Sequence, residues 1–227
     1  MDEPPFGSIA GLLGRTLVTT LDGRELRAAP REHGAIRVGD DGALLIDPLN
    51  DWSLADAFPV PLAPGRYRVA TLREADVEAT NYGAIATCAY REGPPPTRWE
   101  RSPRPFSTGT SNVMLIVPTA FARLVDLLER ESAADLDRGD REWTPDDGRF
   151  WNGVVDLCGA LEGAEAFWEG QGFRFNVHPE GGDGVGFMTP GGCHPYLGFD
   201  DEGRCIALIC PWIGLAGRSL EQDGVAW

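Results

Sequence analysis

Short apolar segments alternate with Gly, Asp and Pro clusters along most of the chain, a pattern that predicts many short β-strands. The alternation is clearest near the C-terminal end, where turn residues separate apolar runs at 173–177, 185–188, 195–199 and 205–210. Asp201-Glu202-Gly203 predicts a tight turn between the last two runs, because Gly can adopt the positive φ that a hairpin loop needs. We therefore expect antiparallel strands joined by short turns over 173–212.

The N-terminal half of the chain contains further strand-like runs, at 15–20, 36–38, 43–46, 66–71 and 82–90. Asp47-Pro48 ends the third run, since the residue before a proline avoids the helical region. In the last two runs apolar or aromatic residues occupy alternate positions, and we expect these runs to pair as antiparallel neighbours. The prolines within 58–65 predict irregular chain there, and the charged segment 98–105 predicts a loop or an edge strand.

Helical periodicity occurs in two segments of the second half. Apolar residues fall on one helical face over 121–128, after a Pro118 that suits a first helical turn. They do so again over about 150–162, and Gly163 follows as a stop. Because helices do not alternate with strands, the pattern predicts an α+β fold rather than a doubly wound one. We expect a curved antiparallel sheet or partial β-sandwich with two helices packed on it.

The length of 227 residues suits one large domain with a substantial core, and no linker divides the sequence. We expect a single domain over 1–227. It would comprise an N-terminal lead with strands at 1–42, a core at 43–212 and a C-terminal tail at 213–227.

Acidic residues dominate the charge, with 35 Asp and Glu against 20 basic residues and a net charge of −15. Every basic residue is Arg, and the lack of Lys beside much Ala, Gly and Pro indicates GC-rich coding and a bacterial origin. This charge argues against nucleic-acid binding, which depends on cationic neutralisation of phosphates, and favours a basic protein partner. The N-terminal apolar stretch is too short for a signal peptide or membrane span, so we expect a cytoplasmic protein.

Two motifs resemble the DUF4241 domain family of uncharacterised bacterial proteins. One is Asp47-Pro48 with Pro64-Gly65-x-Tyr67-x-Val69, and the other is Gly191-Gly192-x-His194-Pro195-x-x-Gly198-x-Asp200-x-x-Gly203-Arg204. The resemblance covers roughly Leu44–Trp212, and it departs from the family at Ser111-Asn112-Val113-Met114 and at Pro211-Trp212. It implies the strand-and-turn fold described above and transfers no activity.

Candidate catalytic residues are concentrated in the C-terminal stretch. His178 and His194 lie beside turns, and with Asp183 and Asp200 they could form an acid–base cluster at one edge of the sheet. The alternative is that both histidines hydrogen-bond to the backbone of turns. Cys193 adds a possible nucleophile or ligand beside His194, but adjacent side chains on a strand point to opposite faces. That pair would need a bulge to serve one site.

Metal and cofactor motifs are absent from the sequence. The five cysteines have no zinc or disulfide spacing and lie mostly in apolar runs, which predicts free, buried thiols. The glycines of 182–186 resemble a phosphate loop, but an apolar strand follows them where a helix would be needed. Residues 135–140 resemble a calcium loop without its required order of ligands. We expect no cofactor and no metal.

Four tryptophans in the second half could line an aromatic pocket or interface, or could pack in the core: Trp143, Trp151, Trp168 and Trp212. The leading hypothesis is a binding protein, such as one of the immunity type, that uses an acidic face against a basic partner. The alternative is a small metal-independent hydrolase, lyase or cyclase of specialised metabolism, with a small-molecule pocket at the C-terminal strands.

Overall fold

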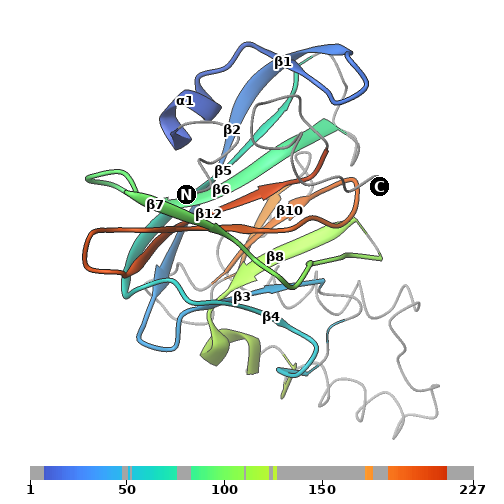
Figure 1. Ribbon diagram of the computed structural model, residues 1–227. Helices are drawn as coiled ribbons and strands as arrows, with labels where there is room; N and C mark the ends of the chain where they lie inside the picture. The colour runs from blue at the N-terminus through green and yellow to red at the C-terminus, as the bar shows by residue number, and fades with distance from the viewer. Residues whose placement is uncertain are drawn as a thin grey trace, which may run out of the picture.

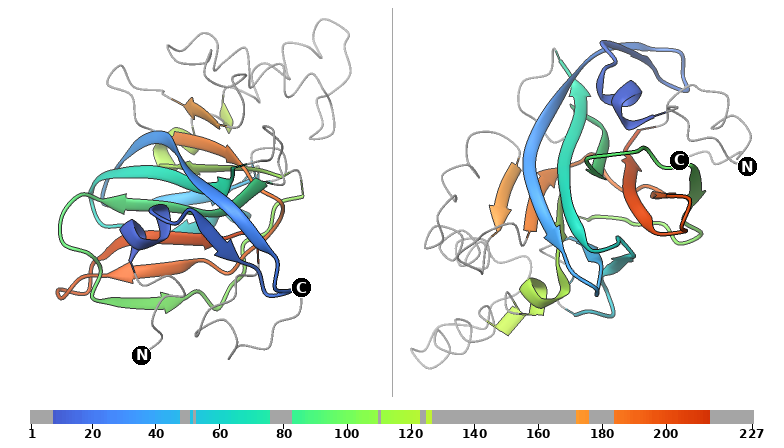
Figure 2. Two further views of the ribbon diagram at one scale, coloured as in Figure 1. Left: turned by 90° about the horizontal axis from the view of Figure 1, so that it is seen from above. Right: turned by 90° about the vertical axis from the view of Figure 1, so that its left-hand side faces the viewer.

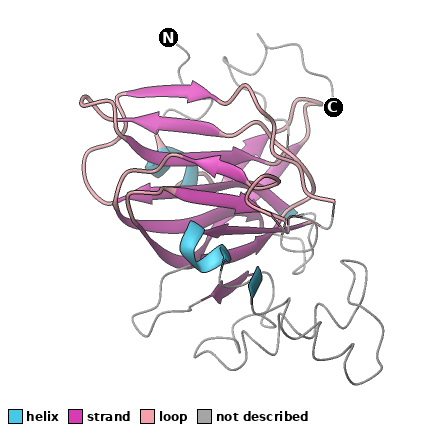
Figure 3. Cartoon of the chain, turned by 90° about the horizontal axis from the view of Figure 1, so that it is seen from below, coloured by secondary structure: helices cyan, strands magenta, loops and turns pink. Residues whose placement is uncertain are grey.

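Strands dominate the described part of the chain (Figures 1 and 3). The computed structural model describes residues 8–47, 51, 53–75, 83–109, 111–122, 125–126, 172–175 and 184–213. α-Helix is confined within these residues to α1 (Ile9–Leu13) and to 118–122 and 125–126. The architecture is therefore a curled antiparallel β-structure with short helices, and the α+β description fits it only loosely. The helix expected over 150–162 lies outside the described residues.

The strands form two antiparallel sheets. Seven strands form the larger sheet, in the spatial order β1 (Leu17–Thr19), β2 (Glu25–Val38), β5 (Gly65–Glu74), β6 (Ala84–Arg91), β12 (Cys205–Pro211), β11 (Tyr196–Phe199) and β7 (Arg98–Arg101). Five strands form the smaller sheet, in the order β4 (Phe58–Val60), β3 (Ala43–Ile46), β8 (Asn112–Ile116), β10 (Gly184–Met188) and β9 (Gly172–Phe175).

The long strands β2 and β5 lie side by side and curve around the molecule, so that the larger sheet resembles half of a barrel (Figure 2). A β-bulge interrupts their pairing between Glu32 and Gly34 and adds His33 to β2. Bulges increase local twist and turn a side chain to a new direction. Strand β2 also contacts β10 of the smaller sheet. We call the face of the larger sheet that is turned toward the smaller sheet its inner face.

Buried apolar side chains cover both faces of the larger sheet. On the inner face, Ile36 and Tyr67 pack with Leu45 and Met114 of the smaller sheet in the main core. On the outer face, Leu72 belongs to a second core. Leu12 of α1 packs in this core, together with Val18, Ile85, Trp99, Tyr196 and Ile209. Burial on both faces explains why β5 and β6 read as almost continuous apolar runs.

Several expected elements match the structure. Residues 43–46 form β3, the run at 66–71 lies in β5, residues 84–90 of the run at 82–90 lie in β6, and these two strands pair antiparallel as expected. Segment 98–105 contributes the edge strand β7. The last two C-terminal runs form the hairpin of β11 and β12, and Gly203 in its turn has a φ of 76°.

Three expectations need correction. The short strand predicted at 36–38 is the end of the 14-residue β2, whose length was hidden by its charged residues, Pro30 and the bulge. The segment 58–65 contains strand β4, because an edge strand tolerates the missing N–H of Pro59. The strand before the C-terminal hairpin, β10, does not pair with it; β10 belongs to the smaller sheet.

Gly42 should be intolerant of a side chain for two reasons. Its φ is 71°, and a Cβ there would lie 2.7 Å from the carbonyl oxygen of Val60. Gly23 has a similar φ of 82° but open space around it, so it is the matched control. We expect Gly23→Ala to lower the free energy of unfolding by about 1–2 kcal/mol and Gly42→Ala to lower it by clearly more, as measured by urea unfolding. Equal losses would mean that the close approach to Val60 has no energetic effect.

Candidate functional site

Cys193 is a buried structural residue of the main core. Its backbone forms an isolated antiparallel bridge with Phe106, with hydrogen bonds of 2.8 Å in both directions. Gly192 permits this approach, because a Cβ at that position would lie 2.8 Å from the Phe106 carbonyl oxygen. The Cys193 thiol contacts the thiol of Cys210, and burial is the main cause that raises the pKa of Cys210.

His194 lies beside Cys193 and is half-buried. Its Nδ1 atom is 3.1 Å from the carbonyl oxygen of Ser102, a backbone contact of the kind expected if the histidine is structural. The Cys193 side chain is in the core, whereas the His194 ring contacts the segment that leads out of β7. The structure thus engages the two neighbours in separate contacts.

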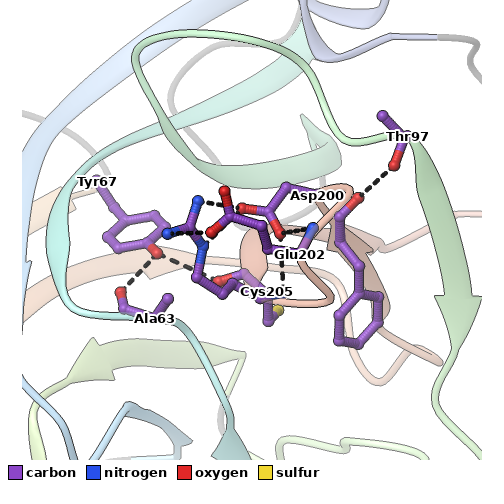
Figure 4. Close-up of polar contacts among 8 residues, drawn as sticks. Ala63, Tyr67, Thr97, Asp200, Glu202 and Cys205 are labelled. Carbon is purple, nitrogen blue, oxygen red and sulfur yellow. Dashed lines mark hydrogen bonds and ion pairs between the residues drawn. The ribbon is translucent and has the colours of Figure 1, made fainter.

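Asp200 lies in the turn between β11 and β12 (Figure 4). Its carboxylate accepts hydrogen bonds from the backbone N–H groups of Glu202 and Arg204, at 3.0 and 2.9 Å, and from Arg204 Nε at 2.8 Å. Desolvation opposes ionisation, but the hydrogen bonds from Arg204 hold the pKa of Asp200 below its ordinary value. These contacts close the hairpin.

Strand β11 separates His194 from Asp200, and its four residues alone span roughly 13 Å. The described residues therefore do not bring Cys193, His194 and Asp200 together in one site. His178 and Asp183 lie outside the described residues, as do three of the four candidate tryptophans, Trp143, Trp151 and Trp168.

Tyr67 is buried in the main core, and its hydroxyl group lies near the same hairpin (Figure 4). Its hydroxyl donates to the carbonyl oxygen of Ala63 at 2.7 Å and lies 3.3 Å from that of Cys205. Burial raises the pKa of Tyr67 to about 12, so the phenol is neutral and acts as a hydrogen-bond donor.

Trp212, the fourth candidate tryptophan, belongs to a buried polar cluster between the two sheets. Its Nε1 atom donates to the Thr87 hydroxyl at 2.8 Å, the Thr87 and Thr71 hydroxyl oxygens are 2.8 Å apart, and Thr71 Oγ1 lies 2.9 Å from His33 Nε2. All four side chains are buried. We call these residues the inter-sheet polar chain, and it is the candidate functional site.

The sequence builds this chain through strand pairing. Thr71 and Thr87 are direct partners in the β5–β6 pair, so their side chains share a face. The bulge in β2 turns His33 to that face, where its ring packs against Phe187 of β10 with a centroid distance of 5.9 Å. Trp212 follows β12 and closes the other end. Four elements from distant parts of the sequence therefore meet in one cluster.

His33 is neutral in the folded protein near pH 7. Burial, and then the positive charges of Arg31 and Arg73, lower the pKa of His33 to about 4. The histidine can therefore accept or donate one hydrogen bond at Nε2 according to its tautomer, while the two arginines supply positive charge beside it. Among the described residues that the sequence nominated, Trp212 alone belongs to this cluster.

The cysteines of the described residues are free and buried, as predicted: Cys88, Cys193, Cys205 and Cys210. Burial raises the pKa of Cys205 to about 11 and that of Cys88 further still. Thiols in this state are poor nucleophiles, because the thiolate is the reactive form. Among the described residues, no group of three or more His, Cys, Asp or Glu side chains could hold a metal ion.

Sequence reasoning missed His33, Thr71 and Thr87. The available signal was weak: a threonine within each of two apolar strands, and a His-Gly pair inside a stretch that did not read as a strand. No family model matches the chain, and no curated protein or solved structure is significantly similar to it. Across the ranges that the structure describes, no helix is long and apolar enough to cross a membrane.

Proposed function

We propose that the protein is a binding protein of the bacterial cytoplasm, such as one of the immunity type, which uses acidic residues to hold a basic protein partner. The observation that supports this most directly is the distribution of charge. Residues 127–171 contain twelve Asp and Glu and only four Arg. This acidic segment lies outside the described residues and falls between β8 and β9 in the sequence.

The described framework neutralises many of its charges locally. Surface ion pairs join Arg24 to Asp22, Arg68 to Glu32, and Arg204 to Asp200, each at 2.8 Å. Exposed pairs of this kind stabilise a fold little, but they leave less net charge to attract a partner. The framework thus presents a nearly balanced surface, and the acidic segment carries about half of the net charge of −15. A cationic partner would be attracted to that segment first.

Neutralising part of the acidic segment should weaken partner binding. The variant Asp135→Asn/Asp137→Asn/Asp140→Asn removes three negative charges from it. We expect a basic partner, recovered from the native host by affinity capture and then purified, to bind this variant on the order of tenfold more weakly at low salt. The measurement is the dissociation constant at two or more salt concentrations.

The matched control removes three exposed acids of the framework, Asp40→Asn/Asp41→Asn/Asp201→Asn. It changes the net charge equally and should bind the partner as the wild type does. Equal weakening by both variants would reduce the effect to overall charge. A set of captured proteins that lacks any basic member, at low and at moderate salt, would refute the proposed function.

A further inference from the structure

Two buried cysteines meet on the inner face of the larger sheet, at the open end of the β11–β12 hairpin. Tyr196 and Ile209 are direct partners in this hairpin, and both pack in the outer core. Cys210 follows Ile209 along β12 and therefore points to the opposite, inner face. Cys193 lies just before the hairpin and packs in the same main core as Cys210, where the two thiols are in contact.

Other contacts hold the two cysteines close together. The backbone of Cys193 is bridged to Phe106 by two hydrogen bonds of 2.8 Å. The Phe106 ring lies 6.3 Å from that of Trp212, two residues beyond Cys210. The direct partner of Cys210 on β6 is Thr87, a member of the inter-sheet polar chain. A covalent bond between the two thiols would therefore tie the segment before β11 to the end of β12, beside that chain.

Cys193 lies in a segment that can open locally. It belongs to no named strand, and its neighbours Gly192 and His194 are only half-buried. A short segment held by few backbone hydrogen bonds opens at a lower free energy than the whole fold. Loss of the bridge to Phe106 would expose the Cys193 thiol, whereas Cys210 would stay in β12, which is paired on both sides.

We propose that Cys193 and Cys210 form a reversible redox switch, which a peroxide closes as a disulfide and a dithiol reductant opens again. With hydrogen peroxide, the exposed Cys193 thiol loses its proton, and its sulfur attacks one oxygen. The O–O bond breaks, leaving a sulfenic acid and, after protonation, water. The Cys210 sulfur then attacks the sulfenic sulfur, so that an S–S bond forms and a second water leaves with the Cys210 proton.

The balance is two thiols oxidised by two electrons, and one hydrogen peroxide reduced to two molecules of water. The reductant reverses the change by thiol–disulfide exchange and becomes a disulfide itself. The switch uses the core of the framework and not the acidic segment, so the inference does not depend on the proposed protein partner.

The test treats the full chain with hydrogen peroxide, alkylates the remaining thiols and digests the protein with trypsin, which cleaves after Arg. Cys193 is the only cysteine of peptide 175–204, and Cys210 lies in peptide 205–218. We expect these two peptides to be joined with the loss of two hydrogen atoms, and dithiothreitol to separate them. The urea midpoint of the oxidised protein should rise by about 1 M, because a disulfide that closes a short loop disfavours the unfolded chain.

The matched control is Cys205→Ala, because peptide 205–218 also contains this second buried cysteine of β12. The control should keep the crosslink and the shift of the midpoint, whereas Cys193→Ala and Cys210→Ala should lose both. The wild-type measurements test the proposal even if a variant fails to fold. The proposal would be overturned if all thiols stayed open to alkylation after peroxide treatment, if the crosslink survived Cys210→Ala or vanished in Cys205→Ala, or if crosslinking left the urea midpoint unchanged.

Discussion

Replacing Trp212 with alanine should lower the free energy of unfolding by about 3–5 kcal/mol, the usual cost of truncating a large buried aromatic side chain. Trp212 is only 6% exposed, and its ring lies 6.1 Å from that of Phe187 and 6.3 Å from that of Phe106. Truncation would open a cavity between the sheets and remove the donor that ends the inter-sheet polar chain at Thr87. Urea unfolding monitored by circular dichroism measures the loss.

Two milder variants separate packing from hydrogen bonding. Trp212→Phe keeps most of the ring and removes the N–H donor, and Thr87→Val removes the acceptor while preserving shape. Each should cost about 1–3 kcal/mol, since a buried polar group loses a partner. Their effects should not add in the double variant, because both break the same hydrogen bond. Strict additivity, or a loss below about 1 kcal/mol in Trp212→Ala, would show that the indole is not held as described.

Prediction from the sequence succeeded where local signals agree with the tertiary environment. The runs that became β3, β5 and β6 are apolar on both faces, and they are central or doubly covered strands. The turn at 201–203 was recognisable because Asp200 and Gly203 satisfy its conformation in their own sequence neighbourhood. Such features need no information about distant parts of the chain.

Prediction failed where pairing across the fold overrides local character. Strand β2 contains charged residues at many positions and is a strand because β5 and β1 hold it by hydrogen bonds on its two sides. The apolar β8, which pairs with β3 and β10, was not recognised as a strand at all. The short apolar runs before and after the 189–193 segment look alike in sequence, yet β10 and β11 belong to different sheets. Sheet membership of this kind depends on long-range contacts.

The candidate site shows the same limit. Among the nominated residues that the structure describes, Cys193, His194 and Asp200 have separate structural contacts, and Trp212 alone belongs to the inter-sheet polar chain. Its partners come from β2, β5 and β6, and none of them stands in a recognisable motif. The bulge in β2 brings His33 into this cluster. The sequence around His33 is polar and predicts a loop, so the bulge could not be recognised from it. The cluster is therefore defined by contacts between distant strands and not by a local sequence pattern.

His33 should make the protein less stable as the pH falls from about 6.5 to about 4. The pKa of His33 is about 4 in the folded protein, against 6.5 for an unperturbed histidine. Above pH 6.5 both states are neutral at this residue and the stability is complete. Between the two values the unfolded chain binds a proton that the folded protein does not, so the free energy of unfolding falls. The total loss is roughly 3 kcal/mol and is complete below pH 4.

Carboxylates also titrate in this range, so the measurement compares the wild type with His33→Gln, whose amide can still hydrogen-bond to Thr71. The difference between their unfolding free energies, followed from pH 7.5 to pH 4, isolates the contribution of His33. This difference should change by roughly 3 kcal/mol. A flat difference profile would mean that the ring is solvated. Removing Arg31 and Arg73 should raise the pKa of His33 only part of the way to 6.5, because burial is the larger cause and the arginine charges are the smaller one.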